Sequence, residues 1–242
     1  MIKWVLMCSA LFFGVALWQS NALPPSSALD ASLQDEPLQR AVGKPAFETT
    51  VGDIAYTVQP LYSYDLAGLV VSRHATDSWW DYIHREWNDA LNIADICVVW
   101  GNNARNGAYS KISFSNGQFT CNWSTSSSED FAAFDQDAVS NNHLLSDNAD
   151  VIRRIRKVRV GDQVRFRGYL AEYSHNHGFP FKRGTSIVRT DTGNGACETV
   201  YVESFEILQE GGGPWRKLSW LAGAMIVLSL IAWFFQPARF DD

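Results

Sequence analysis

Residues 163–173 read QVRFRGYLAEY, and the alternation of apolar and polar positions along them predicts a half-buried strand. Its apolar face is formed by Val164, Phe166 and Leu170, and its polar face by Arg165, Arg167 and Tyr169. A strand of this kind needs neighbouring strands to cover its apolar face, so the stretch places the chain among folds built on a sheet.

Other segments on both sides of this stretch also have the character of strands. They are short, rich in β-branched and aromatic residues, and bounded by turn-forming residues; they span 54–64, 66–73, 96–100, 111–124, 186–190 and 198–208. Pro60 has no backbone N–H, so we expect it at a sheet edge or a bulge. The number of strands favours a small, mostly antiparallel sheet.

Asn116 and Gly117 predict a hairpin with a two-residue loop, because such loops need two residues that tolerate a positive φ. That loop would pair Phe114 with Phe119 and turn Cys121 towards a buried face.

Helices are fewer in the expected fold. Residues 78–92 open with a capping-box-like Ser78-x-x-Asp81 and repeat apolar residues every four positions. Residues 129–139 carry acidic residues in the first turn, and 147–157 direct an apolar face to a core. The fold class predicted is therefore α+β, with two or three helices around a small barrel.

Apolar segments lie near both ends of the sequence. In residues 1–22, Lys3 precedes an uncharged apolar stretch and Ser20-Asn21-Ala22 offers a cleavage site, the pattern of a secretory signal peptide. An uncleaved signal anchor is the alternative. Residues 218–235 contain no charge and predict a transmembrane helix, with tryptophans near both of its ends.

These segments divide the chain and suggest its location. The expected parts are a signal peptide or anchor (1–22), a tether (23–50), an exported barrel-like domain (51–208), a flexible spacer (209–214), a transmembrane helix (215–236) and a short tail (237–242). We expect a bacterial inner-membrane protein with its main domain in the periplasm. Arg216 and Lys217 would then lie on the outer side, against the positive-inside rule.

Composition excludes several classes of protein. A chain of 242 residues that is 46% hydrophobic and 19% charged is not disordered. Residues 23–214 contain 16 Lys and Arg against 24 Asp and Glu, a net charge of −8. So acidic a domain is unsuited to non-specific nucleic-acid binding, which depends on neutralising phosphates.

Three cysteines fall in the exported part. Cys121 faces the buried side of its hairpin and Cys97 begins an apolar strand, so we predict a disulfide between them in an oxidising compartment. Cys197, beside a glycine-rich loop, is left over and is a candidate catalytic thiol.

The most ligand-like cluster in the sequence is Ser174-His175-Asn176-His177-Gly178, because alternate histidines on a strand end can face one metal ion. Candidate catalytic residues are His175, His177, Asp191 and Glu198, with Cys197, His143 or Asp191 as a third metal ligand. The alternative is a polar hairpin loop. His74 and His84 are expected to be structural, and no cofactor and no complete metal site are predicted.

Basic residues are concentrated in one region of an otherwise acidic domain. They predict an anion- or partner-binding stripe made of Arg153, Arg154, Arg156, Lys157, Arg165 and Arg167, with Tyr169 available for stacking. A solvated helix face and the outer face of a strand explain the same pattern.

The segment 160–170 (VGDQVRFRGYL) is similar to the Gly-Asp-x-Val-x-x-x-Gly strand of OB-type barrels, a resemblance that implies a curved strand bent at Gly168. Residues 140–145, 165–179 and 183–202 resemble bacterial envelope proteins with flanking membrane segments. That resemblance implies membrane tethering and assigns no activity.

Two functional hypotheses follow. The first is a membrane-tethered exported module that binds a ligand or partner, as an accessory component of the cell envelope. The second is a metal-assisted hydrolase around His175 and His177, with Asp191 or Glu198 as base. The sequence does not decide whether the protein is an enzyme.

Overall fold

The computed structural model describes residues 2–191 and 196–236, which form two compact units. The larger unit is Pro24–Glu210, and the smaller one contains the helices α1 (Ile2–Ser20) and α6 (Trp215–Phe234). The boundary after residue 210 falls within the spacer expected at 209–214. The tail expected at 237–242 lies outside the described residues.

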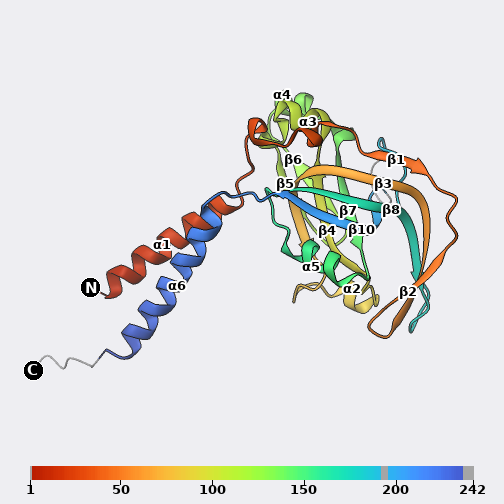
Figure 1. Ribbon diagram of the computed structural model, residues 1–242. Coiled ribbons are helices and arrows are strands. Elements are labelled where there is room, and N and C mark those ends of the chain that lie inside the picture. Colours follow the sequence, from red (N-terminus) through yellow and green to blue (C-terminus); the bar gives the residue numbers. More distant parts are fainter. Residues whose placement is uncertain (1, 192–195, 237–242) are drawn as a thin grey trace, which may run out of the picture. The chain divides into compact units, whose positions relative to one another are not determined.

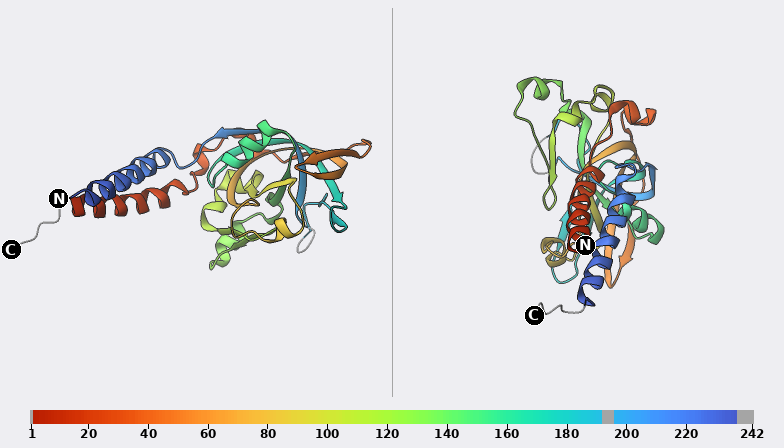
Figure 2. Two further views of the ribbon diagram at one scale, coloured as in Figure 1. Left: turned by 90° about the horizontal axis from the view of Figure 1, so that it is seen from below. Right: turned by 90° about the vertical axis from the view of Figure 1, so that its left-hand side faces the viewer.

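The two long apolar helices, α1 and α6, lie side by side in every view (Figure 1, Figure 2). The ring centroids of Phe12 and Trp215 are 6.4 Å apart, and Gly223 faces the ring of Phe13. Both helices are long and apolar enough to cross a bilayer, and only 11% and 17% of their apolar windows are buried, unlike the core helix of a soluble protein. They indicate membrane association, and α1 also has the length and composition of the expected signal sequence.

An eight-stranded mixed sheet forms most of the larger unit, and five of its strands contribute side chains to the main buried core. In pairing order these five are β3 (Ile54–Ala75), β4 (Asn92–Val99), β7 (Val139–Leu145), β10 (Glu198–Gln209) and β8 (Gln163–His175). β8 also pairs with β3, so the pairing returns to the strand on which it began. The α+β class is confirmed. The sheet is mixed, because β7 and β10 are parallel while the other neighbours are antiparallel.

Three shorter strands extend the sheet, and two more form a separate hairpin. The three are β1 (Leu38–Ala41), β2 (Phe47–Val51) and β9 (Phe181–Arg183), and the hairpin strands are β5 (Ser113–Asn116) and β6 (Cys121–Ser124). Both β1 and β2 pair with β3. Residues 24–50 therefore differ from the expected tether, because part of this segment adds two strands to the sheet and buries Leu33 completely.

The core lies against the alternating faces of the central strands. Phe166 on β8 stacks on Phe205 of β10 with ring centroids 5.9 Å apart, and both side chains are buried. Gly168 sits between them and the end of β8, where an added Cβ would lie 1.9 Å from the carbonyl oxygen of Tyr201. Only glycine allows β8 and β10 to approach this closely. Pro60 lies at a register shift between β3 and β8, as expected for a bulge.

The helices of the larger unit are short and lie around the sheet. They are α2 (Ile83–Glu86), α3 (Gly101–Asn106), α4 (Ser128–Ala133) and α5 (Ala149–Lys157), with 3₁₀ turns at Ser26–Ala28, Ala31–Gln34, Ala108–Lys111 and Gln136–Ala138. In Figure 1, α3 and α4 lie at one end of the sheet and α2 at the other. α5 matches the helix expected at 147–157; Asn148 caps it, and Val151 and Ile155 are buried.

Four local predictions are wrong. Residues 186–190, expected as a strand, form no strand, and the helix expected over 129–139 is divided into α4 and the 3₁₀ turn Gln136–Ala138. The helix expected over 78–92 is only the single turn α2. The Asp81 carboxylate accepts the His84 N–H as an N-cap does, so the turn begins after Asp81, and Asn88 adopts a left-handed φ of 55° that ends it. The hairpin pairs Phe114 with Trp123 instead of Phe119, and its loop spans 117–120. Phe119 takes the positive φ, 65°, because its N–H donates to the carboxylate of Asp95.

Candidate functional site

Buried polar side chains gather where β3 ends and where β4 and β7 run beside it. Every residue in this group is at most 3% exposed. The group consists of His74, Asp81, His84, Asp89, Asn92, Asp95 and His143. Asp81 and His84 come from the connection between β3 and β4, and the others from the adjoining strands and the residues just before β4. We call this set the His–Asp network.

One half of the network is built on the carboxylate of Asp81. Its Oδ2 lies 2.6 Å from Nε2 of His74 and 2.5 Å from Nδ1 of His84. Its Oδ1 accepts the backbone N–H of His84 at 3.1 Å and the side-chain amide of Gln118 at 3.2 Å. One carboxylate oxygen therefore accepts hydrogen bonds from two imidazole rings, and the bonds to the other oxygen fix the orientation of the carboxylate.

The second half is joined to the first by Asn92. Its amide nitrogen lies 3.2 Å from Nε2 of His84 and 3.0 Å from Oδ1 of Asp95. The same Asp95 oxygen lies 2.6 Å from Nδ1 of His143, whose Nε2 accepts from Arg183 at 2.9 Å. His84 and His143 each donate from Nδ1 and accept at Nε2, so the hydrogen bonds assign both rings as neutral.

Burial and charge shift the pKa values of these groups in different directions. Burial lowers the pKa of His84 and His143, which keeps both rings neutral. Burial alone would raise the pKa of Asp95, but the His143 ring and the Asn92 amide lower it to about 2. Burial raises the pKa of Asp89 to about 7, although the Tyr173 hydroxyl lies 2.8 Å from both of its oxygens.

Phe119 covers the network on its hairpin side. Its ring stacks on the ring of Trp87 with centroids 5.3 Å apart, and its centroid lies 4.1 Å from that of the His84 ring. The guanidinium of Arg183 lies over the same ring at 4.0 Å. The aromatic residues limit the access of water to the histidines, which strengthens every polar interaction beneath them.

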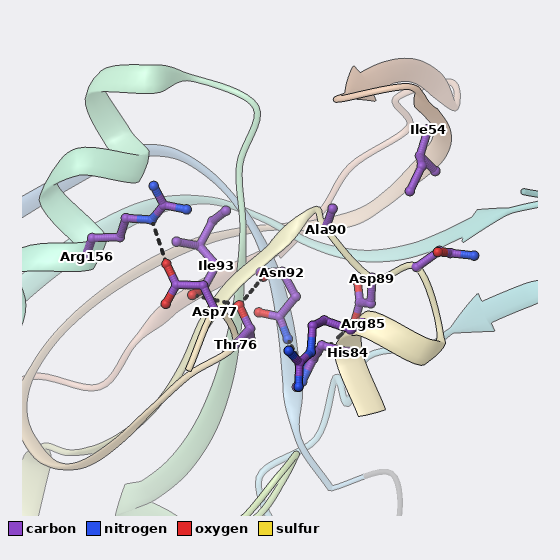
Figure 3. A pocket seen from close by; sticks show the side chains of 11 residues that line it. Ile54, Thr76, Asp77, His84, Arg85, Asp89, Ala90, Asn92, Ile93 and Arg156 are labelled. Carbon is purple, nitrogen blue, oxygen red and sulfur yellow. Dashed lines mark hydrogen bonds and ion pairs between the residues drawn. The ribbon is translucent and has the colours of Figure 1, made fainter. Parts of the chain in front are cut away.

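A cavity of about 300 Å³ opens beside the network (Figure 3). His84, Asp89 and Asn92 line it from one side, and Arg156 of α5 reaches it from the other and lies 3.3 Å from Asp77. The cavity therefore extends to the edge of the His–Asp network.

An exposed aromatic surface lies on the same β3–β4 connection. Trp79 is 86% exposed, Trp80 is 49% exposed and Tyr82 is 62% exposed. The ring of Trp80 also packs on His74 with centroids 4.6 Å apart. We call these three residues the aromatic platform. Large exposed aromatic side chains that lie close together in the chain are candidates for an interaction site.

The histidine pair predicted from the sequence lies at the far end of β8. His175 is buried, its Nε2 contacts the carbonyl of Trp87 at 2.9 Å, and its Nδ1 accepts the backbone N–H of His177 at 3.1 Å. Both ring nitrogens of His175 are thus used in local contacts. His177 is exposed.

The other predicted catalytic residues line different parts of the molecule. Asp191 accepts from the Ser186 hydroxyl at 2.5 Å and lines a cavity with Cys197, whereas His175 and His177 line a separate one. Glu198 is buried, and burial raises its pKa to about 7 although Arg189 lies 2.5 Å away. Residues 192–195 of the glycine-rich loop before Cys197 lie outside the described residues.

The three exported cysteines have different states. Cys97 and Cys121 form the predicted disulfide, which joins β4 to β6. Cys197 is free and half-buried, and burial raises the pKa of its thiol. Because a thiolate is the reactive form, this environment does not activate Cys197 as a nucleophile.

The residues of the predicted basic stripe are divided between two elements. Arg153, Arg154, Arg156 and Lys157 belong to α5, and Arg165, Arg167 and Tyr169 belong to β8. Arg165 and Arg167 both bind Asp65 with N–O distances of 2.8 Å. Since Arg156 also pairs with Asp77, these contacts occupy part of the positive charge that an anion would need.

His74, Asp81 and His84 come together at a site that the sequence did not predict. A search for ligand spacing would have found His-x₆-Asp-x₂-His, but the expected long helix gave the two histidines a structural role. No protein-family model matches the sequence, and no curated protein or solved structure is significantly similar to it. The arrangement of these side chains is therefore what bears on function.

Proposed function

We propose that the protein is a membrane-tethered binding module of the cell envelope, with its larger unit exported to the bacterial periplasm. The two apolar helices support the membrane tether, and the Cys97–Cys121 disulfide supports an oxidising compartment. A role as accessory component of an envelope complex remains part of this proposal.

We further propose that the five central strands form a small OB-like barrel. The return of the pairing from β8 to β3 supports closure. The parallel β7–β10 pair, the helix α5 between β7 and β8, and the close approach of β8 to β10 at Gly168 are consistent with that assignment. In OB folds the second and third strands and the loop that joins the first two bind oligosaccharides or oligonucleotides. The corresponding loop here carries the aromatic platform.

The aromatic platform is the observation that carries the ligand assignment. Trp79, Trp80 and Tyr82 offer flat apolar surfaces with polar groups near their edges, which suits stacking on the faces of sugar rings. The acidic charge of the domain disfavours a polyanion such as a nucleic acid. We therefore infer that the ligand is an uncharged stretch of envelope glycan.

Glycan binding is tested with the full-length protein in detergent micelles. Uncharged oligosaccharides of N-acetylglucosamine are titrated in, and tryptophan fluorescence is followed. We expect saturable binding that Trp79→Ala or Trp80→Ala weakens roughly 5- to 150-fold, because a stacked aromatic residue contributes about 1–3 kcal/mol. Phe131→Ala is the matched control, since Phe131 is 49% exposed on the separate helix α4.

Three results would contradict this assignment. They are the absence of saturable glycan binding, an equal loss in the Phe131→Ala control, and fluorescence changes that require phospholipid vesicles instead of glycan. The last result would identify the platform as a membrane-surface contact.

Export and the accessory role are tested separately. Alkaline phosphatase fused after residue 208 should be active if the larger unit is periplasmic, and an inactive, stably expressed fusion would contradict export. Mild crosslinking in cells should recover one defined neighbour, whereas a partner-free monomer in repeated experiments would contradict an accessory role. Nothing in the geometry favours the alternative hydrolase at His175 and His177, because the His175 ring is fully used in local contacts.

A further inference from the structure

We propose that His74, Asp81 and His84 bind a divalent transition-metal ion, for which Zn²⁺ is the best chemical match. This site differs from the sequence-predicted histidine pair on β8 and does not depend on the identity of the ligand at the aromatic platform. It would join the end of β3 to the β3–β4 connection through one ion.

The donor set and its placement support the site. Two imidazole nitrogens and one carboxylate oxygen all lie within 4.8 Å of one another, and all three residues are buried. Two histidines and one carboxylate are a common protein ligand set for zinc, which leaves one position for water or another ligand. Imidazole donors favour the later first-row metals over Ca²⁺ or Mg²⁺.

The donors already converge on one point. Nε2 of His74 and Nδ1 of His84 approach the same Asp81 oxygen at 2.6 and 2.5 Å, which are hydrogen-bond distances. Zinc bonds of about 2.0–2.2 Å place tetrahedral donors about 3.3 Å apart, so each pair must separate by roughly 0.7 Å when the ion enters. Side-chain rotation on a connection with only one helical turn can provide this movement.

The surrounding contacts orient the donors. The backbone N–H of His84 and the amide of Gln118 hold the second oxygen of Asp81. Metal-binding side chains typically have such outer partners, which fix the direction of the donor atom. Binding through Nδ1 moves the His84 proton to Nε2, so the Asn92 amide must turn. Its Oδ1 has no hydrogen-bond partner among the described residues and can become the acceptor.

The local charge also favours a cation. The carboxylates of Asp81 and Asp95 are fully buried in the network. Within the described part of the chain, Arg183 is the one Lys or Arg side chain hydrogen-bonded to it. Buried carboxylates are costly unless they are paired, and a divalent ion between two neutral imidazoles would offset that cost.

The test uses the full-length protein in detergent, treated with a chelator and then dialysed. Co²⁺ is titrated as a spectroscopic substitute for zinc, and Zn²⁺ is then added in competition. We expect one equivalent of Co²⁺ with a visible ligand-field band, which Zn²⁺ removes. Asp81→Asn keeps the size of the side chain and should weaken binding by more than the roughly 10- to 100-fold cost of an outer-partner replacement.

Two control variants locate the ion. His143→Gln changes an equally buried histidine that contacts Asp95, and His177→Ala changes the exposed histidine of the β8 loop. Both should keep one equivalent of Co²⁺. The proposal is overturned if folded wild-type protein takes up no Co²⁺, or if Asp81→Asn binds it as tightly as wild type. It is also overturned if His177→Ala, and not Asp81→Asn, abolishes uptake. If Asp81→Asn fails to fold, the absence of Co²⁺ uptake by folded wild-type protein still overturns the proposal, and loss of uptake in His177→Ala does so too.

Discussion

Gly168→Ala tests the close approach of β8 and β10 with the smallest possible change. Gly168 pairs with Val202, next to a bulge in β10, and an added Cβ would lie 1.9 Å from the Tyr201 carbonyl oxygen. Real Cβ atoms essentially never approach a neighbouring atom within 3.0 Å, so the strands must separate by at least about 1.1 Å. The obstructing atom is backbone, which cannot move aside as a flexible side chain would.

The loss in the free energy of unfolding comes from the interactions that are broken when β8 and β10 separate. A shift of this size disrupts about two ladder hydrogen bonds, each of which contributes about 1 kcal/mol net. It also loosens the packing of Phe166 on Phe205, and overpacking by itself typically costs about 1–3 kcal/mol. We expect a total loss of about 3–5 kcal/mol. For a unit of this size the melting temperature should fall by roughly 10 °C.

The assay is thermal unfolding of the full-length protein in detergent, followed by near-ultraviolet circular dichroism of the aromatic core. Gly184→Ala is the control, because Gly184 is exposed and its added Cβ would meet no atom within 4 Å. Its stability should change by less than about 0.5 kcal/mol. If Gly168→Ala melts within about 1 °C of wild type, β8 and β10 do not approach each other as described, and the role given to this glycine is wrong.

Three further substitutions test other parts of the structure. Cys97→Ala opens a disulfide that spans 24 positions and should lower stability by about 3 kcal/mol in urea unfolding, whereas Cys197→Ala should leave the disulfide intact by non-reducing mass spectrometry. Hydrogen bonds from the neighbouring arginines, chiefly Arg165, lower the pKa of Asp65, so their stabilisation is present above its unfolded pKa near 3.8 and lost as pH falls through the folded pKa. Asp65→Asn should therefore be less stable than wild type by about 1 kcal/mol at pH 7, and the difference should disappear at strongly acidic pH; a constant difference would contradict this. The Asp95 carboxylate accepts hydrogen bonds from His143 and from the Phe119 N–H, and Asp95→Asn would place an amide N–H against these donors. We therefore expect the free energy of unfolding to fall by about 3 kcal/mol, as measured by urea unfolding at neutral pH.

The local sequence pattern was sufficient to predict a helix or strand wherever one face of the element is apolar and buried. The alternation of Val164 and Phe166 placed β8 correctly, and the spacing of Val151 and Ile155 placed α5. The disulfide followed from two cysteines on apolar strands. In each case the residues that specify the element lie within it, so a window of about ten residues contains the necessary information.

The same reasoning failed wherever a distant residue sets the local conformation. Asn116-Gly117 is a strong hairpin signal, yet the loop moved towards Phe119 because Asp95, 24 residues earlier in the chain, accepts its N–H. The segment after Ser78 has helical periodicity, yet the contacts of Asp81 with His74 and His84 replace most of the helix. A tertiary hydrogen bond to a buried carboxylate can outweigh the few tenths of a kcal/mol by which propensity favours one local structure.

The failures at Asn116-Gly117 and after Ser78 lie at one place, and that coincidence bears on function. The displaced hairpin loop supplies Phe119 and Gln118 to the His–Asp network, and the interrupted helix supplies Asp81 and His84. Two neighbouring segments thus depart from their local preference in order to complete the same buried polar cluster. Natural sequences are expected to break local rules mainly where function or a special interaction compensates for the loss. A merely structural core would be formed more readily by apolar residues, because a buried carboxylate between two imidazoles adds a desolvation cost that close packing does not have.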